Sequence, residues 1–559
     1  MSRTMTTAEA IQEARRCLNC ARPTCRTGCP IENNIPGFIR ALSEGNIGMA
    51  YEIISECSNL PAICGRVCPH ERQCEAHCVL TKKKCGIEIG SLEMFIADFA
   101  HNNDLKPTQP SSKLRGKVAV IGSGPAGLTV AGDLAKMDFD VTIFEAQSEP
   151  GGVLLFGIPE FRLQKDVVRR EISELQHIGV EIRTKQLAGV DFTVDDLFAQ
   201  GYDAIFMGTG TSLPRTLDIP GKELSGILTA TYFLRMVVLA DGGKLDASET
   251  LLHTGDNVIV VGAGNVAMDA ARTSIRRGAK NVTIVYHKTE AEISAFPSEY
   301  EAAVAEGVQF RFLKQPIAYF NKKQMRALKN IRRQATAADE TELAGLLLQN
   351  ITKTENGEFI AEGGQELIPC DCVILAVGQK PAARIVSSTK GIQVDKQGFV
   401  ITRDRPYGMT TRAGVFSSGD VVHGPATVVL AMKESKKVAA GIAQYVDAKK
   451  LLEDCTMDST TLIISIFRIQ KNRHFPKSEE MTVLFLLFAI FSIRGMIGAA
   501  DNVIDSKAML ERSSDKFLCL QYRFLHAQAV CQTCGNCCRE GAARSMVVGR
   551  INFSAQPFL

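Results

Sequence analysis

The stretch Val118-Ala-Val-Ile-Gly122-Ser-Gly124-Pro-Ala-Gly127-Leu decides the fold of this chain. Four apolar residues predict a buried parallel strand, and the G-x-G-x-x-G that follows predicts a tight turn into a helix. A second predicted strand ends at Glu145, 23 residues after Gly122, where a carboxylate can accept both ribose hydroxyls of a dinucleotide. The pyrophosphate would then lie on the helix N-terminus. Gly151-Gly152 would let a cofactor approach the backbone, although a plain turn after Pro150 explains the pair equally well.

A second strand, glycine loop and helix begin at Val258. The loop Gly262-Ala-Gly264-Asn-Val-Ala267 is G-x-G-x-x-A, and the next predicted strand, 282–286, ends in His287-Lys288 instead of an acid. Without a carboxylate for a 2′-hydroxyl, and with two potentially cationic groups there, the pattern favours NADP over NAD. Three arginines of the following helix either add charge to this site or form a solvated basic face: Arg272, Arg276 and Arg277.

A third segment closes the first nucleotide site. The apolar residues 415–418 lead to Gly419-Asp420, and Thr427-Val428 opens a predicted helix that extends to Tyr445. Asp420 can hold a ribityl chain, and the helix N-terminus can place positive charge beside a flavin; read in isolation, Asp420 is a helix cap or turn residue. Two dinucleotide folds in one chain predict FAD and a nicotinamide that exchange a hydride. That chemistry needs no general acid or base, so we assign no catalytic residue.

Ten of the eighteen cysteines lie between residues 17 and 85. Eight of them form two runs: Cys17, Cys20, Cys25 and Cys29 before Pro30, and then Cys64, Cys68, Cys74 and Cys78. Closely spaced thiolates bind Fe–S clusters or zinc, and the nucleotide loops beside them favour clusters that carry electrons. From the spacing alone, Cys64 is predicted to be the fourth ligand of the second cluster. A capping box, Thr6 with Glu9, predicts a short helix that ends just before Cys17.

Composition excludes several classes of protein. The net charge of +3 gives no reason to expect a nucleic-acid surface. The first residues lack a signal-peptide pattern, and many cysteines without such a signal indicate a reducing, cytoplasmic location. Cys370 and Cys372 are expected to be buried structural cysteines instead of a redox-active pair, because their spacing is C-x-C and they adjoin an apolar strand. Glu292, Ser298 and Glu299 are either near the nicotinamide or, preferably, on a surface helix.

These patterns predict an α/β protein in which a helical iron–sulfur domain precedes two Rossmann-like domains and an unassigned tail. We expect the boundaries to be 1–113 for the iron–sulfur domain, 114–255 and 381–448 for the FAD domain, 256–380 for the NAD(P)H domain, and 449–559 for the tail. The apolar stretch 481–493 of the tail is shorter than the roughly 20 residues of a spanning helix, so a membrane anchor is not expected. The cysteines Cys531, Cys534, Cys537 and Cys538 fit a third cluster, a zinc site with Cys519, or a degenerate remnant.

The order of these motifs resembles one family over residues 7–448. The cysteine runs, GSGPAG, EPGG, GIPEFRL, GAGNVAMDAART, ILAVGQKP and SSGD resemble the small (β) subunit of NADPH-dependent glutamate synthase. They are also similar to the N-terminal half of dihydropyrimidine dehydrogenase and to the large subunit of ferredoxin:NADP oxidoreductase. The resemblance implies that electrons pass from NADPH through FAD and two [4Fe–4S] clusters to a larger amidotransferase or FMN-containing partner subunit, or to ferredoxin. The alternative function, from another class of protein, is that of a non-enzymatic iron–sulfur redox sensor.

The resemblance also implies roles for individual residues. One cluster would be held by Cys17, Cys20, Cys25 and Cys78, and the other by Cys29, Cys68, Cys74 and, in place of Cys64, the carboxylate of Glu93. The FAD contacts would be Gly124, Ala126, Glu145, Gly152, Arg162, Asp420 and Thr427. The NADP contacts would be Gly264, Asn265, Val266, Lys288 and the turn from Ala376 to Gly378. His287 stands where the family usually has arginine, which leaves NADH possible because imidazole is mostly neutral at cytosolic pH.

Overall fold

The computed structural model describes residues 3–470 except 108, 110–112, 246–251, 254, 329–335, 383–384 and 387–388, with side chains described up to residue 452. Residues Met1–Glu453 form one compact unit, and Asp454–Leu559 form another. The tail cysteines from Cys519 to Cys538 and the apolar stretch 481–493 lie outside the described residues. Among the helices that the structure describes, none is both long and apolar enough to cross a membrane.

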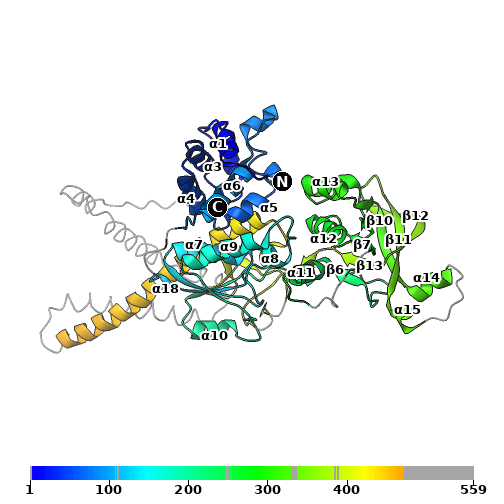
Figure 1. The fold of residues 1–559 in the computed structure, drawn as a ribbon. Coiled ribbons are helices and arrows are strands. Elements are labelled where there is room, and N and C mark those ends of the chain that lie inside the picture. Colours follow the sequence, from blue (N-terminus) through cyan, green and yellow to red (C-terminus); the bar gives the residue numbers. More distant parts are fainter. Residues whose placement is uncertain are drawn as a thin grey trace, which may run out of the picture. The chain divides into compact units, whose positions relative to one another are not determined.

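Short helices make up the N-terminal part of the chain (Figure 1). The capping box at Thr6 and Glu9 is present, as expected, and the first helix ends just before Cys17. An apolar core that includes Phe38, Leu42 and Leu92 holds the helices together. The elements are α1 (Thr7–Arg15), α2 (Thr24–Gly28), α3 (Ile35–Ser43), α4 (Ile47–Cys57), α5 (Pro61–Val67), η1 (His70–Arg72), η2 (Val79–Lys83) and α6 (Ile89–Asn102).

The first glycine loop belongs to a seven-stranded sheet with the order β15-β16-β17-β4-β1-β2-β3. The strands β17, β4, β1, β2 and β3 are parallel, and β16 and β15 are added antiparallel at one edge. Val118 and Val120 point into one core, and Ala119 and Ile121 into another, so β1 is covered on both faces. The strands are β1 (Gly116–Ile121), β2 (Phe139–Phe144), β3 (Glu181–Arg183), β4 (Ala204–Met207), β15 (Thr402–Asp404), β16 (Tyr407–Thr410) and β17 (Val415–Ser417).

Helices lie on both faces of this sheet, with α7 and α9 on one side and α10 on the other (Figure 1). The last helix, α18, begins where the sequence predicts but continues to Gln470, well past the expected end at Tyr445. The residues Ala448-Lys-Lys-Leu-Leu-Glu453 are good helix formers, and no Gly or Pro interrupts the chain between Tyr445 and Gln470, which allows the continuation. The helices are α7 (Pro125–Lys136), α8 (Val153–Phe156), α9 (Lys165–His177), α10 (Val194–Ala199), α17 (Asp420–His423) and α18 (Val428–Gln470).

The second glycine loop belongs to a five-stranded parallel sheet with the order β6-β13-β7-β8-β9. The chain leaves the first sheet through β5 (Leu213–Pro214) and comes back past β14 (Gln379–Lys380), which pairs with β5. The strands of the sheet are β6 (Ile227–Thr229), β7 (Asn257–Val261), β8 (Asn281–Val285), β9 (Gln309–Arg311) and β13 (Cys372–Leu375). Its helical elements are α11 (Ala230–Asp241), α12 (Asn265–Arg276), η4 (Glu290–Glu292) and α13 (Pro297–Ala305).

An antiparallel sheet of three strands, which the sequence did not predict, follows β9. It is formed by β10 (Lys314–Asn321), β11 (Leu343–Lys353) and β12 (Phe359–Pro369), with α14 (Lys322–Leu328) and α15 (Ala337–Thr341) between the first two strands. The two nucleotide folds and the helical N-terminal part confirm the α/β architecture that the sequence predicts.

Candidate functional site

The first glycine loop has the backbone geometry that a dinucleotide requires. Gly122 has a φ of +98°, in the left-handed region, and it leads the chain out of β1. A Cβ at Gly127 would collide with the carbonyl oxygen of Gly122, so only glycine lets α7 pack this close to the strand. At Gly124, the residue before α7, no described heavy atom lies within 4 Å of where a Cβ would be. The open space at a helix N-terminus fits a phosphate.

Glu145 lies at the loop because Ser123 binds it there. The backbone N–H of Ser123 donates to Oε2 of Glu145 at 3.0 Å, and its hydroxyl donates to the same oxygen at 2.5 Å. The Ser123 hydroxyl also accepts from the N–H of Gly151 at 2.9 Å. Ser123 therefore joins three predicted segments. The sequence analysis did not single it out, since it occupies an unrestricted position of the motif.

Two further glycine segments lie against the same loop. A Cβ at Gly152 would be 2.9 Å from the Cα of Gly124, and a Cβ at Gly419 would be 2.9 Å from the Cβ of Ala126. Residues that are almost 300 positions apart in sequence therefore meet at one helix N-terminus. The structure brings together six residues predicted for the FAD site: Gly122, Gly124, Ala126, Glu145, Gly152 and Gly419.

Asp420 and Thr427 lie just beyond Gly419. The N–H of Ala426 donates to Oδ1 of Asp420 at 3.3 Å, and burial raises the pKa of Asp420 to about 6. Thr427 caps α18, because its hydroxyl and its carbonyl oxygen both accept from the N–H of Leu430. The N-terminal end of α18 therefore lies close to the first residue of α17, Asp420.

Arg162 lies in a buried network of charged groups. It donates to the carboxylates of Asp269 on α12, at 2.8 Å, and Glu299 on α13, at 2.9 Å. Glu299 in turn binds Arg272 at 2.8 Å. The segment GIPEFRL of the first nucleotide fold is therefore tied to the helix of the second glycine loop. The expectation that Glu299 lies on a surface helix is wrong: its side chain is 4% exposed, because it neutralises two buried arginines.

The second glycine loop repeats the geometry of the first. A Cβ at Gly262 would be 2.5 Å from the carbonyl oxygen of Ala376, which explains why the turn after β13 packs directly on the loop. The N–H of Phe296 donates to the side chain of Asn265 at 2.9 Å, while Val266 is 42% exposed. Seven residues predicted for the nicotinamide nucleotide lie in this loop, on the turn, or just after β8: Gly262, Gly264, Asn265, Val266, Lys288, Ala376 and Gly378.

His287 and Lys288 follow β8, where a 2′-phosphate would lie. Burial, together with the charge of Lys288, lowers the pKa of His287. The neighbouring arginines are occupied by carboxylates. Arg272 and Arg276 bind Glu306, and Arg277 binds Asp241. Arg272 is buried between carboxylates, so neither suggestion holds for it. Arg276 and Arg277 are 49% and 36% exposed, so the alternative of a solvated face describes them.

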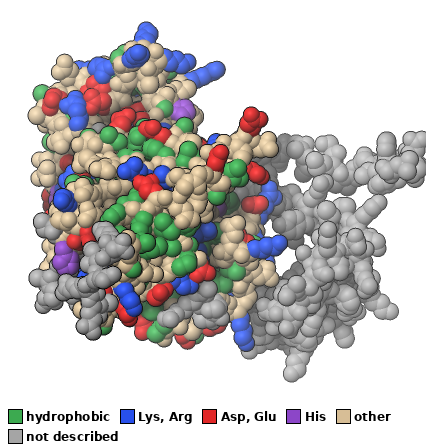
Figure 2. Space-filling model, turned by 90° about the vertical axis from the view of Figure 1, so that its right-hand side faces the viewer, with side chains coloured by type: hydrophobic (Ala, Val, Ile, Leu, Met, Phe, Trp, Pro, Cys, Tyr) green, Lys and Arg blue, Asp and Glu red, His purple; other side chains and the backbone are tan. Residues whose placement is uncertain are grey.

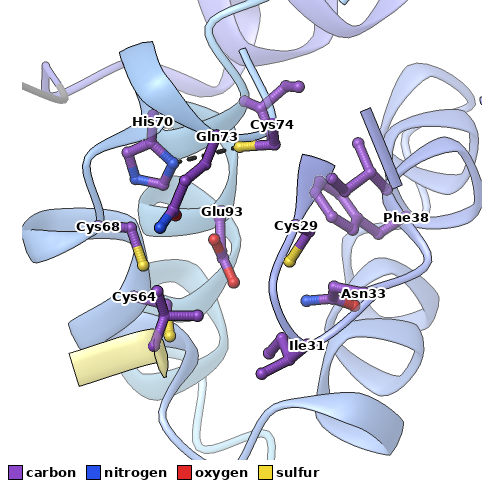
Figure 3. Close-up of a pocket in the computed structure, with 13 residues that line it drawn as sticks. Cys29, Ile31, Asn33, Phe38, Cys64, Cys68, His70, Gln73, Cys74 and Glu93 are labelled. Carbon is purple, nitrogen blue, oxygen red and sulfur yellow. Dashed lines mark hydrogen bonds between the residues drawn. The ribbon is translucent and has the colours of Figure 1, made fainter. Parts of the chain in front are cut away.

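Cysteines from both runs line a small hollow, which we call the inner pocket (Figure 3). Three of its cysteines are Cys29, Cys68 and Cys74. Glu93, from α6, directs its carboxylate into the space between Cys29 and Cys68 (Figure 3). The remaining lining residues are Ile31, Asn33, Ile35, Phe38, Cys64, His70, Gln73, Ile89 and Val429.

Cys64 also lines the inner pocket, where its thiol lies beside that of Cys68 and raises the pKa of Cys68. The Cys64 sulfur lies 3.6 Å from the sulfur of Met432 on α18 and 3.9 Å from the hydroxyl of Ser58. His70 was not predicted, and its Nδ1 lies 3.4 Å from the sulfur of Cys74. The His70 Nε2 is buried without a described partner, and burial lowers the pKa of this side chain to about 4. The only feature of the sequence that points to His70 is its position directly after Cys68-Pro69.

A second hollow, which we call the outer pocket, is lined by Cys17, Cys20, Cys25 and Cys78. Two apolar residues on its lining are largely exposed: Leu18 is 62% exposed and Val79 is 40% exposed. The two pockets thus separate the eight predicted ligands into the two sets that the resemblance implies.

The donor groups of both pockets fit an iron–sulfur cluster. Burial raises the pKa of Glu93 to about 8, that of Cys29 to about 12 and that of Cys25 to about 11. These groups are therefore neutral at pH 7 unless a cation compensates their charge, and bound iron does so by binding the deprotonated forms. Thiolates select soft metal centres, which agrees with this donor set.

The inner pocket lies against the helix that closes the first nucleotide site. Val429, two residues after Thr427, lines the pocket, and Met432 contacts Cys64. Ile31, Leu60 and Ile63 share one apolar core with β1 and α7. The cysteine pocket and the expected flavin site are consequently two sides of one packed structure.

Cys370 and Cys372 are buried, with 2% and 3% of their surfaces exposed. Burial raises the pKa of both thiols, Cys372 to about 12, so they are inert structural cysteines, as predicted. All twelve described cysteines are free. Glu292 is bound to Lys353 and its charge also acts on His287, while Ser298 contacts Glu71.

Family models match both parts of the chain. Residues 1–105 match the family "dihydropyrimidine dehydrogenase domain II, 4Fe-4S cluster", and residues 116–435 match "pyridine nucleotide-disulphide oxidoreductase". Together with the two nucleotide folds, these matches define an NAD(P)H-dependent flavin oxidoreductase with an iron–sulfur domain.

Curated relatives give the family more closely. Glutamate synthase [NADPH] small chains from Halomonas elongata and Escherichia coli K12 are 34% and 33% identical, over 78% of this chain and over 91% and 92% of their own lengths. An NAD-dependent dihydropyrimidine dehydrogenase subunit PreT homolog from Salmonella typhi is 32% identical over 78% of this chain and 94% of its own. The chain therefore belongs to the pyridine nucleotide-disulphide oxidoreductase family, in the group that contains the glutamate synthase small chains. The resemblance that the motifs suggested is confirmed.

Proposed function

We propose that this protein is the electron-input subunit of a larger enzyme, most similar in role to a glutamate synthase small chain. When bound, NADPH and FAD would supply hydride transfer, and two [4Fe–4S] clusters would carry single electrons to a partner subunit. The observation that carries the proposal is the packing of the inner pocket on α18. Val429 and Thr427 belong to the same first turn, so one helix end borders both the cysteines and the flavin site.

In this proposal the first glycine loop and Glu145 hold the FAD pyrophosphate and ribose. Asp420 binds the ribityl chain, and the capped N-terminus of α18 places partial positive charge beside the flavin ring. Arg162 would also contact the FAD, from the segment that its ion pairs with Asp269 and Glu299 hold in place. The hydrophobic cores on both faces of β1 support the proposal, because they hold the loop rigidly.

The second glycine loop would hold the nicotinamide nucleotide, with NADPH preferred and NADH as the alternative. The positive charge of the Lys288 ammonium group favours the binding of a 2′-phosphate. His287 has a lowered pKa and adds little positive charge at neutral pH. The relatives include both an NADPH enzyme and an NAD-dependent enzyme. Comparison of kcat/KM for the two nucleotides decides between them, with NADPH expected to be the better substrate.

We further propose that Cys17, Cys20, Cys25 and Cys78 hold one cluster, and that Cys29, Cys68, Cys74 and Glu93 hold the other. The lining of the outer and inner pockets supports this division. A cytoplasmic location is part of the proposal, because free thiols and iron–sulfur clusters are maintained in a reducing compartment. A dihydropyrimidine dehydrogenase subunit is the second candidate, supported by the relative from Salmonella typhi.

Anaerobic titration of the purified protein with NADPH tests the function. The flavin absorbance should bleach with one equivalent, and turnover with ferricyanide should be fast. If NADPH and NADH both leave the flavin oxidised, the proposed function is wrong. If NADPH reduces the flavin but turnover is very slow with every electron acceptor, the protein would instead be an iron–sulfur redox sensor.

A further inference from the structure

The segments around the outer pocket carry charge of one sign. Residues 15–28 and 76–86 contain seven Lys and Arg residues and no Asp or Glu, whereas the whole chain has a net charge of only +3. We call these seven residues the basic face: Arg15, Arg16, Arg22, Arg26, Lys82, Lys83 and Lys84. In Figure 2, Lys and Arg side chains gather at the top of the molecule, the end at which α1 lies in Figure 1.

Most of this charge is not neutralised within the described part of the chain. Arg16 binds Glu13, and Arg26 donates to the carbonyl oxygen of Glu32. Arg22 and the three lysines are exposed, and none of them forms an ion pair with a described carboxylate. Four free positive charges within two short segments create a local potential that attracts an anionic surface.

The apolar residues of the outer pocket lie among these charges. Leu18 and Val79 are largely exposed, and both line the pocket with Cys17 and Cys78. An exposed apolar centre surrounded by charge is the usual composition of a transient protein interface. The groups that line the inner pocket are more deeply buried: Cys74 is 5% exposed and Glu93 is 7% exposed. Of the two pockets, the outer one is therefore better placed to pass an electron to a partner.

We propose that the basic face is the docking site of the electron-accepting partner, and that this partner presents an acidic surface around its own redox centre. This inference rests on the proposed function and adds the chemistry of the partner to it. Leu18 and Val79 would bring the partner's redox centre close to the outer pocket, while the lysines and Arg22 orient it. Electrostatic attraction of this kind acts mainly on the association rate and fades with salt.

Two one-electron haem proteins of opposite charge serve as probes: cytochrome b5, which is acidic, and cytochrome c, which is basic. In each reaction NADPH and two ferric haems yield NADP⁺, one proton and two ferrous haems. At low ionic strength the acidic protein should be reduced with a kcat/KM roughly 10-fold or more above that of the basic protein. As the salt concentration rises from about 0.01 M to about 1 M, the ions screen the charges of both proteins. The ratio of the two kcat/KM values should then fall to the value expected without electrostatic attraction.

The substitutions Lys82→Glu, Lys83→Glu and Lys84→Glu, combined in one variant, reverse the charge of η2. We expect this variant to lose the preference for cytochrome b5 and to prefer cytochrome c at low salt. The matched control changes three exposed lysines outside the N-terminal helices: Lys280→Glu, Lys390→Glu and Lys396→Glu. It should keep the preference of the unchanged protein. Because each result is a ratio of two acceptors, a loss of folded protein cannot produce it.

The outcomes separate this inference from the proposed function. If NADPH fails to reduce even ferricyanide, the proposed function has failed. If ferricyanide is reduced but the ratio is the same in the η2 variant, the basic face does not receive the partner. Salt-sensitive binding to anionic phosphatidylserine vesicles or to nucleic acid, without any preference between the haem proteins, would also overturn the inference.

Discussion

Glu93 is a carboxylate among the thiols that line the inner pocket. Its burial raises its pKa to about 8, so it binds as an anion only beside a cation. We expect Glu93→Ala to lose one of two clusters, with the iron and acid-labile sulfide contents falling by about half. Low-temperature EPR of the dithionite-reduced protein measures the loss directly.

Cys64→Ser is the matched comparison for Glu93→Ala. Because the Cys64 sulfur contacts Met432 and Ser58, this variant should keep both clusters and the EPR spectrum of the unchanged protein. The opposite result, in which Cys64→Ser loses iron and Glu93→Ala keeps it, would make Cys64 the ligand.

Asp420 gives the flavin-free protein a specific pH dependence. Its pKa is about 6 in the folded protein and about 4 in the unfolded chain, so folding favours the protonated carboxyl. Stability is therefore lost as the pH rises through the window from about 4 to about 6. We expect Asp420→Asn to be more stable than the unchanged protein by roughly 3 kcal/mol above pH 6, and to show no such gain near pH 4. Urea unfolding at several pH values measures the difference.

Asp395→Asn provides the control for this measurement. Asp395 also accepts backbone hydrogen bonds, but it is exposed. Its substitution should show no gain that grows between pH 4 and pH 6. A constant stability difference between Asp420→Asn and the unchanged protein across this range would mean that Asp420 is not buried.

At the scale of elements, α12, α13 and the segment before α9 are held together by buried charges. Glu299 on α13 lies between Arg162 and Arg272, and all three side chains are at most 10% exposed. Glu299→Gln leaves two arginines without their shared carboxylate, which costs about 3–5 kcal/mol. Thermal unfolding should therefore begin at a lower temperature in this variant.

Glu301→Gln removes a charge from the same helix at an exposed position. Such a surface change should alter stability by about 0.5 kcal/mol or less. Equal melting temperatures for the Glu299 and Glu301 variants would show that the buried network contributes nothing. A second signature is expected in Glu299→Gln alone: the KM for NADPH should rise, because α12 begins at the second glycine loop.

At the scale of the whole molecule, the clusters and the nucleotide folds are expected to act in sequence. Each sheet has its own hydrophobic cores, and neither glycine loop contains a cysteine. Iron removed by a chelator should therefore leave NADPH able to bleach the flavin, while reduction of cytochrome b5 falls by roughly 10-fold or more. Stopped-flow absorbance records both rates in the same sample.

This prediction fails if iron-free protein reduces cytochrome b5 as fast as the native protein does, because the electrons would then leave directly from the flavin. Reconstitution with ferrous iron and sulfide is the control, and it should restore the rate.

Local sequence predicted the elements at the sites well, and it failed where a side chain found a distant partner. The capping box at Thr6, both glycine loops and the buried pair Cys370 and Cys372 follow from residues that are close in sequence. Arg272 and Glu299 were taken for surface or nucleotide-site residues, because nothing in their local sequence shows that they neutralise each other. The length of α18 was also underestimated, since it has no Gly or Pro signal at Tyr445.

The sequence by itself determined the class of this protein, because glycine turns, strand periodicity and cysteine spacing are properties of short segments. It could not distinguish Cys64 from Glu93 by spacing. Tertiary structure decided which side chains share a pocket, and it placed Cys29 with Cys68 instead of with Cys25. It also decided which pocket lies against α18 and which one lies beside the basic face. The physical reason is that burial and charge compensation depend on contacts between segments far apart in the chain.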